Sequence, residues 1–235
     1  MTKHWADGPM AALDFETTGT DPETARIVQA ALVVDNRKEY GGMVTVVDCL
    51  VDSDVEIPKE ATEIHGFTTE IVKKMGFPAK ATIEFLIEAL TEFDDYPLVI
   101  CNVPYDWPLL VAEAKRHEIE IVARPSFLDP LLIDRHVDRY RKGSRKLVDM
   151  AALYEVPFDG KAHSATADAF TAIGVMREIV NRYPDLRKYS LVELQAVQNQ
   201  WYEAWKQGVN AYWEKNNKPQ RVTNSWPKIE RKVAV

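Results

Sequence analysis

The stretch Met10-Ala-Ala-Leu-Asp-Phe-Glu-Thr-Thr-Gly19 joins an apolar β-strand to two acids that stand two positions apart. Because successive side chains of a strand point to opposite faces, Asp14 and Glu16 lie on one face while Leu13 and Phe15 lie on the other. Two neighbouring like charges repel each other and resist burial. The pair therefore predicts a bound cation that neutralises it.

Working outward from this stretch, β-branched runs predict further strands at Arg26–Asp35 and Met43–Val51. The short turns between the three segments predict an antiparallel beginning to a sheet. The apolar segments Leu98–Cys101 and Phe127–Leu128 alternate with helical patterns, which predicts parallel crossovers. The expected fold is α/β, a mixed five-stranded sheet with helices on both faces.

Apolar residues at helical spacing predict helices at Ala81–Phe93, Trp107–His117, Leu131–Tyr140, Lys146–Tyr154 and Ala165–Tyr183. Beyond Pro184 the pattern changes to one long amphipathic helix, whose face carries Leu191, Leu194, Trp201, Trp205, Val209 and Tyr212. We therefore divide the chain into an α/β domain over residues 1–183 and a C-terminal helical extension with a basic tail over 184–235.

The composition excludes several classes of protein. No apolar run reaches the length of about 18 residues that a membrane-spanning helix needs, and the first residues lack the basic-then-apolar order of a secretory signal. With only Cys49 and Cys101 as cysteines, we expect a soluble protein of the reducing cytoplasm. The net charge of −7 means that binding to a polyanion needs a local basic face or bound metal ions.

Two more acids accompany Asp14 and Glu16. Asp106 follows the predicted strand 98–101 across a short turn and opens a helix, while Asp168 lies just beyond His163 with small residues between them. Taken singly, each of these has an ordinary explanation: a turn or helix cap, a surface acid, a loop histidine. Four carboxylates with few nitrogen or sulfur ligands suit Mg²⁺ or Mn²⁺. A pair of such ions is the clamp used for in-line attack on phosphodiesters.

These residues resemble the three motifs of the DnaQ-like, DEDDh 3′-to-5′ exonucleases, which share the ribonuclease H-like fold. The motifs are Asp14-Phe-Glu16-Thr-Thr-Gly, then Asn102 to Asp106, then His163-Ser-Ala-Thr-Ala-Asp168. The resemblance covers about residues 10 to 183. Two further segments of the family are similar here, Ile64-His65-Gly66-Phe67-Thr68 and Lys146-Leu-Val-Asp-Met-Ala-Ala-Leu.

The resemblance implies a role for each matching residue. Two divalent ions, Mg²⁺ or Mn²⁺, would be held by four catalytic carboxylates, Asp14, Glu16, Asp106 and Asp168. His163 would be the general base. The terminal nucleotides would be contacted by Thr17, Thr18, the Ile64-His65 loop, Asn102 and Tyr105.

The second motif departs from the family pattern. Cys101 stands where the family often has a histidine, whereas Tyr105 keeps the aromatic residue before the acid. Pro104 and Trp107 are unusual there, which puts the shape of that wall of the site in question more than the metal ligands.

Two basic segments stand out against the acidic average. Asp134–Lys146 carries six basic residues against two acids, and Lys215–Val235 carries six against one. The first is either an ordinary charged helix and loop or a track for the strand that enters the active site; the second is a solvated tail or a nucleic-acid contact. The tryptophan face of the long helix either packs on the catalytic body or offers a stacking or partner-docking surface.

Three functions remain open. The first is an enzyme that removes nucleoside 5′-monophosphates from the 3′ end of DNA, single-stranded in the simplest case, by two-metal catalysis. The second is a relative that trims RNA or small oligonucleotides, because stacking and backbone contacts do not reveal sugar preference. The third is a nuclease-like subunit that binds a polymerase or another replication or repair protein through residues 191–213. The intact acidic set favours catalysis.

Overall fold

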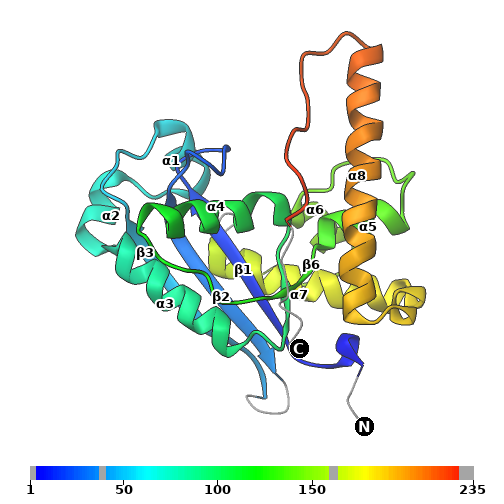
Figure 1. The fold of residues 1–235 in the computed structure, drawn as a ribbon, viewed down its shortest axis with the longest axis horizontal. Coiled ribbons are helices and arrows are strands. Elements are labelled where there is room, and N and C mark those ends of the chain that lie inside the picture. The colour runs from blue at the N-terminus through cyan, green and yellow to red at the C-terminus, as the bar shows by residue number, and fades with distance from the viewer. Residues whose placement is uncertain (1–3, 37–40, 159–163, 228–235) are drawn as a thin grey trace.

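The computed structural model describes residues 4–36, 41–158 and 164–227, and within them six strands form one sheet in the order β4-β3-β2-β1-β5-β6 (Figure 1). The strands are β1 Met10–Thr17, β2 Ile27–Asn36, β3 Gly42–Asp52, β4 Phe77–Pro78, β5 Pro97–Val99 and β6 Ser126–Leu128. The mixed α/β class is therefore confirmed. The predicted number of five strands is one too low, because the two-residue β4 is too short to give a sequence pattern.

The pairing of the strands follows the prediction. β1 and β2 are antiparallel, with Asp14 opposite Ala31, and β2 and β3 continue the antiparallel arrangement. β1, β5 and β6 then run parallel to one another. The carboxyl ends of these three strands consequently meet at one edge of the sheet, where ligands of open α/β sheets characteristically bind.

Side chains of β1 alternate between two hydrophobic clusters. Leu13 and Phe15 belong to the larger cluster on one face of the sheet, and Met10 and Ala12 belong to the cluster on the other face. By the period of two, Asp14 and Glu16 lie on the second face, beyond Ala12. On this face of β1, the row of apolar side chains therefore ends in two carboxylates.

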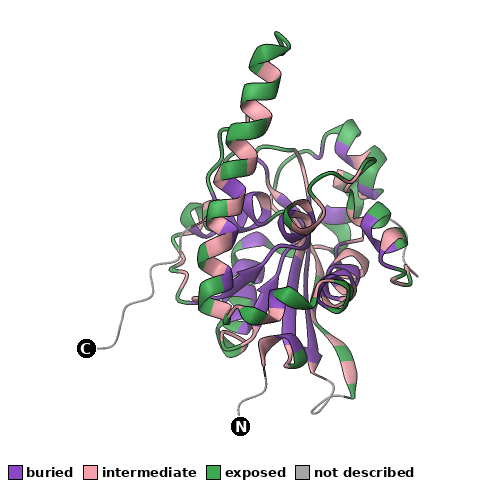
Figure 2. Cartoon of the chain, turned by 90° about the vertical axis from the view of Figure 1, so that its right-hand side faces the viewer, coloured by how far each residue is buried: buried purple, intermediate pink, exposed green. Residues whose placement is uncertain are grey.

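Helices cover both faces of the sheet (Figure 1). α3 (Ala79–Glu92) and α4 (Val103–Arg116) contribute to the first cluster, and α6 (Leu147–Leu153) and α7 (Ala165–Arg182) contribute to the second. α5 (Pro130–Val137) follows β6 and contacts α7. Figure 2 shows the buried residues concentrated on the strands and on the inward sides of these helices. The five predicted core helices are all present, with ends shifted by a few residues.

Two short helices, α1 (Lys59–His65) and α2 (Thr69–Met75), have no counterpart among the predicted elements. They are joined at Gly66, whose φ of 81° is in the left-handed region that glycine adopts readily. Ile64 and His65, expected in a loop, are in fact the last two residues of α1. Each helix spans only two turns, which is too short for a clear amphipathic period.

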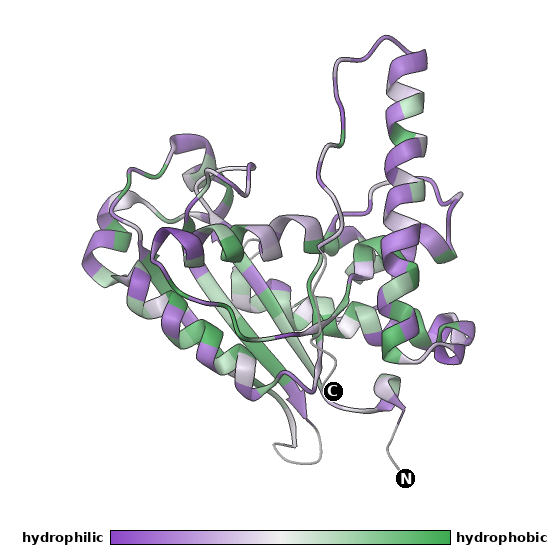
Figure 3. Ribbon diagram, viewed as in Figure 1, coloured by the Kyte–Doolittle hydropathy of each residue, from purple (hydrophilic) through white to green (hydrophobic). Residues whose placement is uncertain are grey.

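The long helix α8 (Leu191–Lys215) begins at a capping box in which Ser190 and Glu193 hydrogen-bond each other's backbone N–H groups. Its first half packs on the body, where Leu194 is fully buried, and its upper half projects beyond the other helices and is largely hydrophilic (Figure 3). The chain then runs back along α8, where Asn210 exchanges two hydrogen bonds with the backbone of Val222, and it buries Trp226 against Tyr202.

The structure thus confirms the long C-terminal helix, whereas the division at residue 183 stays a prediction. Two short 3₁₀ helices, η1 (Trp5–Asp7) and η2 (Pro184–Lys188), complete the elements of the described chain. Across the described ranges, no helix combines the length and apolar character needed to cross a lipid bilayer.

Candidate active site

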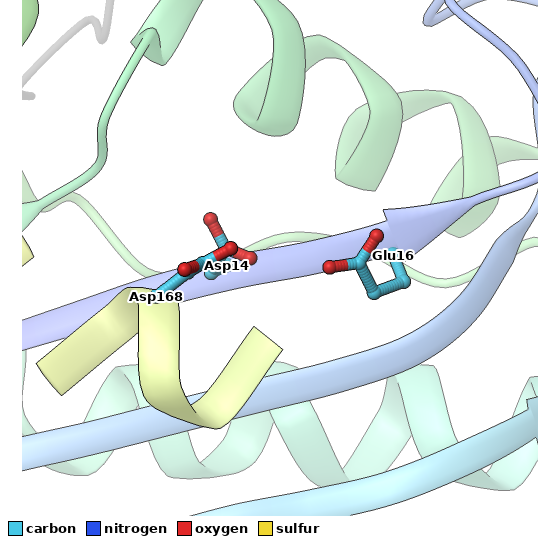
Figure 4. Close-up of side chains that lie close together, drawn as sticks. All are labelled: Asp14, Glu16 and Asp168. Atoms are coloured by element: carbon cyan, nitrogen blue, oxygen red, sulfur yellow. The ribbon is translucent and has the colours of Figure 1, made fainter. Parts of the chain in front are cut away.

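Three carboxylates meet at the edge of the sheet where β1 ends. Oxygen atoms of Asp14, Glu16 and Asp168 all lie within 4.8 Å of one another. Asp14 and Glu16 come from β1, and Asp168 comes from the first turn of α7, so that two segments far apart in the sequence supply one cluster (Figure 4). Of the four predicted acidic ligands, these three are brought together directly.

Asp106, the fourth predicted ligand, lies in the first turn of α4 and is 5% exposed. After burial, its charge is the next cause that raises the pKa of Asp14; burial, followed by the charges of Asp129 and Glu16, raises the pKa of Asp106 well above its usual value. Hydrogen bonds with its own backbone and with that of Phe15 act in the opposite direction. Asp106 therefore belongs to the same electrostatic site on its α4 side.

The cluster is electrostatically unfavourable for ionised acids. Burial, and then the charges of Asp106, Asp168 and Glu16, raise the pKa of Asp14 well above its usual value. Burial and the charge of Asp168 raise the pKa of Glu16 to about 7. Each acid would ionise more readily if a positive charge lay among them. Carboxylate oxygens are the ligands that divalent Mg²⁺ and Mn²⁺ prefer, so this donor set fits such a cation.

Asp129 positions the helix that carries Asp106, and the sequence analysis missed it. Its carboxylate accepts hydrogen bonds from the backbone N–H groups of Asn102 and Val103, at the start of α4, and of Leu131 and Leu132, at the start of α5. It is 2% exposed, and burial raises its pKa to about 6. The dipeptide Asp129-Pro130 directly after a strand is a signal for a helix N-terminus that could have identified it.

Gln29 makes a similar link on the other side of the site, which the sequence analysis also missed. The side-chain oxygen of Gln29 on β2 accepts a hydrogen bond from the backbone N–H of Ala165, the first residue of α7. Its side-chain nitrogen donates to Asp48 on β3. The beginning of α7, and with it Asp168, is thereby fixed to the sheet. A glutamine in a strand gives no distinct sequence signal.

Four of the predicted substrate-contacting residues lie at the end of β1 and at the start of α4. Thr17 and Tyr105 lie together, since the Tyr105 hydroxyl is 2.7 Å from Thr17 Oγ1 and also bonds the carbonyl of Gly19. Asn102 is exposed at the N-cap of α4, where its φ of 81° places it in the left-handed region. The hydroxyl of Thr18 accepts a hydrogen bond from the backbone N–H of Arg26, which ties it to the turn before β2.

Ile64 and His65, the last two residues of α1, were both predicted to contact the substrate but differ in exposure. The ring of His65 is 8% exposed, stacks on Phe67 and accepts a hydrogen bond from its backbone N–H. Ile64 is 56% exposed. Ile64 is thus the member of the pair that can reach a ligand, while His65 shapes the turn behind it. Cys101 is half-buried, and burial, followed by the charges of Asp129, Asp14, Asp106 and Asp168, raises its thiol pKa well above the usual value.

His163 lies outside the described residues, so its predicted role as general base stays a prediction. Ser164, the N-cap of α7, is the first described residue after it, and Asp168 follows one turn later.

A mixed sheet whose first strand ends in clustered carboxylates defines the ribonuclease H-like class of nucleases, and comparisons with known proteins agree with it. The chain matches the exonuclease family RNase_T over residues 11–176. It is 33% identical over 184 residues to an uncharacterized exonuclease, CP81, of Escherichia phage 186, a match that covers 74% of this chain and 89% of the relative.

Two further matches are more distant. The DNA polymerase III subunit epsilon of Rickettsia typhi is 29% identical over 163 residues, 67% of each chain. Escherichia coli exonuclease I, solved in complex with a dT13 oligonucleotide, superposes with a TM-score of 0.66 at 19% identity over 78% of this chain and 43% of that one. The chain thus spans less than half of that solved structure. This protein belongs to the DnaQ-like exonucleases of the ribonuclease H-like superfamily, and it is a nuclease.

Proposed function

We propose that the protein is a metal-dependent 3′-to-5′ exonuclease that releases nucleoside 5′-monophosphates from single-stranded DNA. The observation that carries the proposal is the meeting of Asp14, Glu16 and Asp168 within 4.8 Å. Repulsion among acids that raises their pKa values is hard to explain as a structural device, whereas it is expected of a cation site. Membership of the exonuclease family supports the same reading.

In this proposal Asp14, Glu16, Asp106 and Asp168 hold two divalent ions, Mg²⁺ or Mn²⁺. When bound, such ions make water a stronger nucleophile and stabilise the charge that develops on the leaving 3′-oxygen. The carboxylates would place these ions at the end of β1 and at the first turn of α7. His163 accepts the proton of the attacking water, a role for which an imidazole with an ordinary pKa near 6.5 is suited.

The residues around the carboxylates orient the terminal nucleotide. The Thr17–Tyr105 pair forms a fixed polar wall at the end of β1, because both hydroxyls share the carbonyl of Gly19. Asp129 fixes the same wall from behind, because it holds the first turn of α4, which carries Tyr105 and Asp106. Ile64 is exposed and apolar, and we propose that it packs against the terminal base.

DNA is the proposed substrate because of the relatives. One of them is named as a subunit of DNA polymerase III, and exonuclease I was solved with a DNA oligonucleotide. The polymerase relative also supports a replication protein as a partner of this chain. The test uses matched single-stranded DNA and RNA labelled at one end, incubated with Mg²⁺, Mn²⁺ or EDTA. Stepwise shortening from the 3′ end of DNA is expected, and equal or faster shortening of RNA would reassign the substrate.

A further inference from the structure

A groove between α5 and α8 brings together two sequence features that the analysis of the sequence could not place. One is the arginine-rich segment that begins at Asp134, and the other is the aromatic face of α8. The two helices contact each other and lie side by side at one end of the molecule (Figure 1). The groove has a volume of about 620 Å³, within the range of ligand sites in proteins.

Aromatic side chains form the α8 wall of the groove. Trp201, Trp205 and Tyr212 share one helix face, and the small residues Ala204 and Gly208 between them keep the groove open. Tyr212 is 56% exposed, and the Nζ of Lys218 lies 5.8 Å from its ring centre, which leaves the other face of the ring for stacking. The Trp201 ring already stacks on His136 and the Trp205 ring lies under Arg135, so Tyr212 is the ring of this face left for a base, which stacks through its π-face.

The opposite wall is positively charged. Arg135, Arg139 and Arg145 line the groove, and among the described residues that line it there is no carboxylate. Arg135 stacks over Trp205, with its guanidinium carbon 4.1 Å from the ring centre. Within the described ranges, neither Arg135 nor Arg139 forms an ion pair or side-chain hydrogen bond. Arg139 is exposed, so its charge is available to a ligand, whereas Arg135 is in part engaged by the Trp205 ring and by the charge of Asp129.

The third arginine is held in place by a buried acid. Arg141 and Arg145 both pair with Asp134, whose side chain is fully buried. Two guanidinium groups share one carboxylate, so this cluster also carries an excess positive charge. Tyr154 donates a hydrogen bond to the second oxygen of Asp134. The segment after α5 is thereby fixed beside the groove, which favours binding because little ordering is needed when a ligand enters.

The helix α5, which forms one wall of the groove, begins beside the carboxylate site. Asp129, whose charge acts on Asp106, lies at the N-terminus of α5, and its charge also acts on Arg135, nearly two turns further along. A helix of eight residues is about 12 Å long. Cys101, at the end of β5, is close to Asp129, Asp14, Asp106 and Asp168 together. A chain that leaves the cluster along α5 thus reaches the arginines within a few nucleotides.

We propose that the α5–α8 groove binds the single-stranded part of the nucleic acid substrate upstream of its 3′ end, with phosphates on Arg135, Arg139 and Arg145 and a base on Tyr212. The proposal rests on the proposed exonuclease function and adds to it a second subsite. The groove would hold the strand between successive cleavages. Substrates too short to reach it would lose this contribution to binding.

Gly208 offers a sharp test, because a Cβ added there meets no atom within 4 Å and a side chain would point into open space beside the groove. Gly208→Glu places a carboxylate among the arginines, Gly208→Gln is its uncharged match, and Gln207→Glu adds the same charge at an exposed position that does not line the groove. Replacing a mid-helix glycine also favours the helix, so folding is retained. Binding of 5′-labelled dT20 is measured in EDTA by fluorescence anisotropy.

We expect Gly208→Glu to weaken dT20 binding about tenfold relative to Gly208→Gln, and Tyr212→Ala to weaken it by a similar factor. Gln207→Glu should stay within about twofold of wild type. The salt dependence of binding should also become shallower in Arg139→Ala, because fewer counterions are released. Unchanged dT20 affinity in both Gly208→Glu and Tyr212→Ala would overturn the proposal and leave the groove to another ligand, such as an acidic peptide.

A second readout separates this subsite from the active site. The p-nitrophenyl ester of thymidine 5′-monophosphate is too small to reach the groove, so Gly208→Glu should hydrolyse it at the wild-type rate while degrading dT20 more slowly. Equal losses on both substrates would contradict a separate subsite. If the wild type hydrolyses neither substrate, the exonuclease proposal fails, and the anisotropy measurement still decides whether the groove binds single strands.

Discussion

At the scale of single residues, the charges of the acidic cluster lower the stability of the metal-free protein but are needed for the proposed function. Among the described residues, no positively charged side chain lowers the pKa of Asp14. Burial and the charges of three other acids raise it. Neutralising it removes repulsion from the metal-free protein but also removes a proposed ligand. The residues that we expect to be indispensable for activity are therefore ones whose charge destabilises the empty site.

Asp14→Asn tests this conflict. In EDTA we expect the variant to melt about 2–4 °C above wild type, the shift that corresponds to about 1 kcal/mol in a chain of this size. Mn²⁺ should raise the Tm of wild type and leave that of the variant unchanged, because the site has lost a ligand. Thermal unfolding with and without Mn²⁺ measures both. A variant that still gains stability from Mn²⁺ would remove Asp14 from the metal site.

Glu16 gives a prediction about pH. Its pKa in the folded protein is about 7, above the ordinary value of 4.5, so between these two values the folded state holds the proton more tightly than the unfolded state. The stability of the metal-free protein should therefore fall as the pH rises from about 4.5 to 7. Glu16→Gln should flatten this part of the curve. Chemical unfolding in EDTA at pH 5, 6, 7 and 8 supplies the comparison, and parallel curves for the two proteins would refute it.

His163 is assigned from the sequence alone. We expect His163→Ala to lower turnover by orders of magnitude and to leave the Mn²⁺-induced rise in Tm intact, because a base that holds no metal affects only the chemistry. Asp14→Ala, in contrast, should lose both. Ordinary turnover in a clean His163→Ala preparation would exclude it as the base.

At the scale of elements, α8 is joined to the catalytic sheet through two glutamines, of which Gln195 accepts a hydrogen bond from the backbone N–H of Phe127. The buried side chain of Gln198 accepts a hydrogen bond from the backbone N–H of Asp129 and donates to the carbonyl of Phe127 at β6. The helix that forms one wall of the groove is thus linked to the residue that positions α4. We regard α8 as a support of the site, in addition to its proposed contact with the substrate.

Gln198→Ala should destabilise the protein by about 2–4 kcal/mol, because the mutation leaves buried backbone groups of Asp129 and Phe127 without their partner. Gln200→Ala, an exposed position on the same helix, should change stability by less than about 0.5 kcal/mol. Urea unfolding provides the free energies. Equal, small effects of both substitutions would show that α8 is an appendage that the body does not need.

The elements differ in how well the sequence predicts them, for physical reasons. β1 to β3 carry β-branched runs long enough to show their period, and α3 and α7 show a clear apolar face, so all were predicted. The helices α1 and α2 span about two turns each, and the strand β4 has only two residues. Such short elements form through tertiary contacts, such as the packing of Val72 on α2 with Val28 on β2. Local pattern carries no signal for such elements.

At the scale of the whole molecule, the candidate site is predicted better than its surroundings. Asp14, Glu16 and Asp168 were selected from motif spacing, and the structure brings them together. Asp129, Gln29 and the α5–α8 groove were missed or left unplaced, because each depends on contacts between residues far apart in the sequence. Binding of a replication partner through residues 191–213 stays a prediction.

The charge distribution of the molecule is consistent with a polyanionic substrate despite the net charge of −7. The acids of the site are expected to be offset by metal ions, and three arginines gather in the α5–α8 groove. Part of the predicted basic tail, Lys228, Arg231 and Lys232, lies outside the described residues. Its contribution to binding stays a prediction.

The central claim is that the acidic cluster makes this chain a metal-dependent 3′-to-5′ exonuclease of DNA. The most direct measurement is the degradation of single-stranded DNA labelled at either end, with Mg²⁺, Mn²⁺ or EDTA, by wild type and Asp14→Ala. We predict stepwise shortening from the 3′ end that requires the metal and vanishes in the variant. Metal-independent cleavage, shortening from the 5′ end, or equal activity of Asp14→Ala would contradict the account.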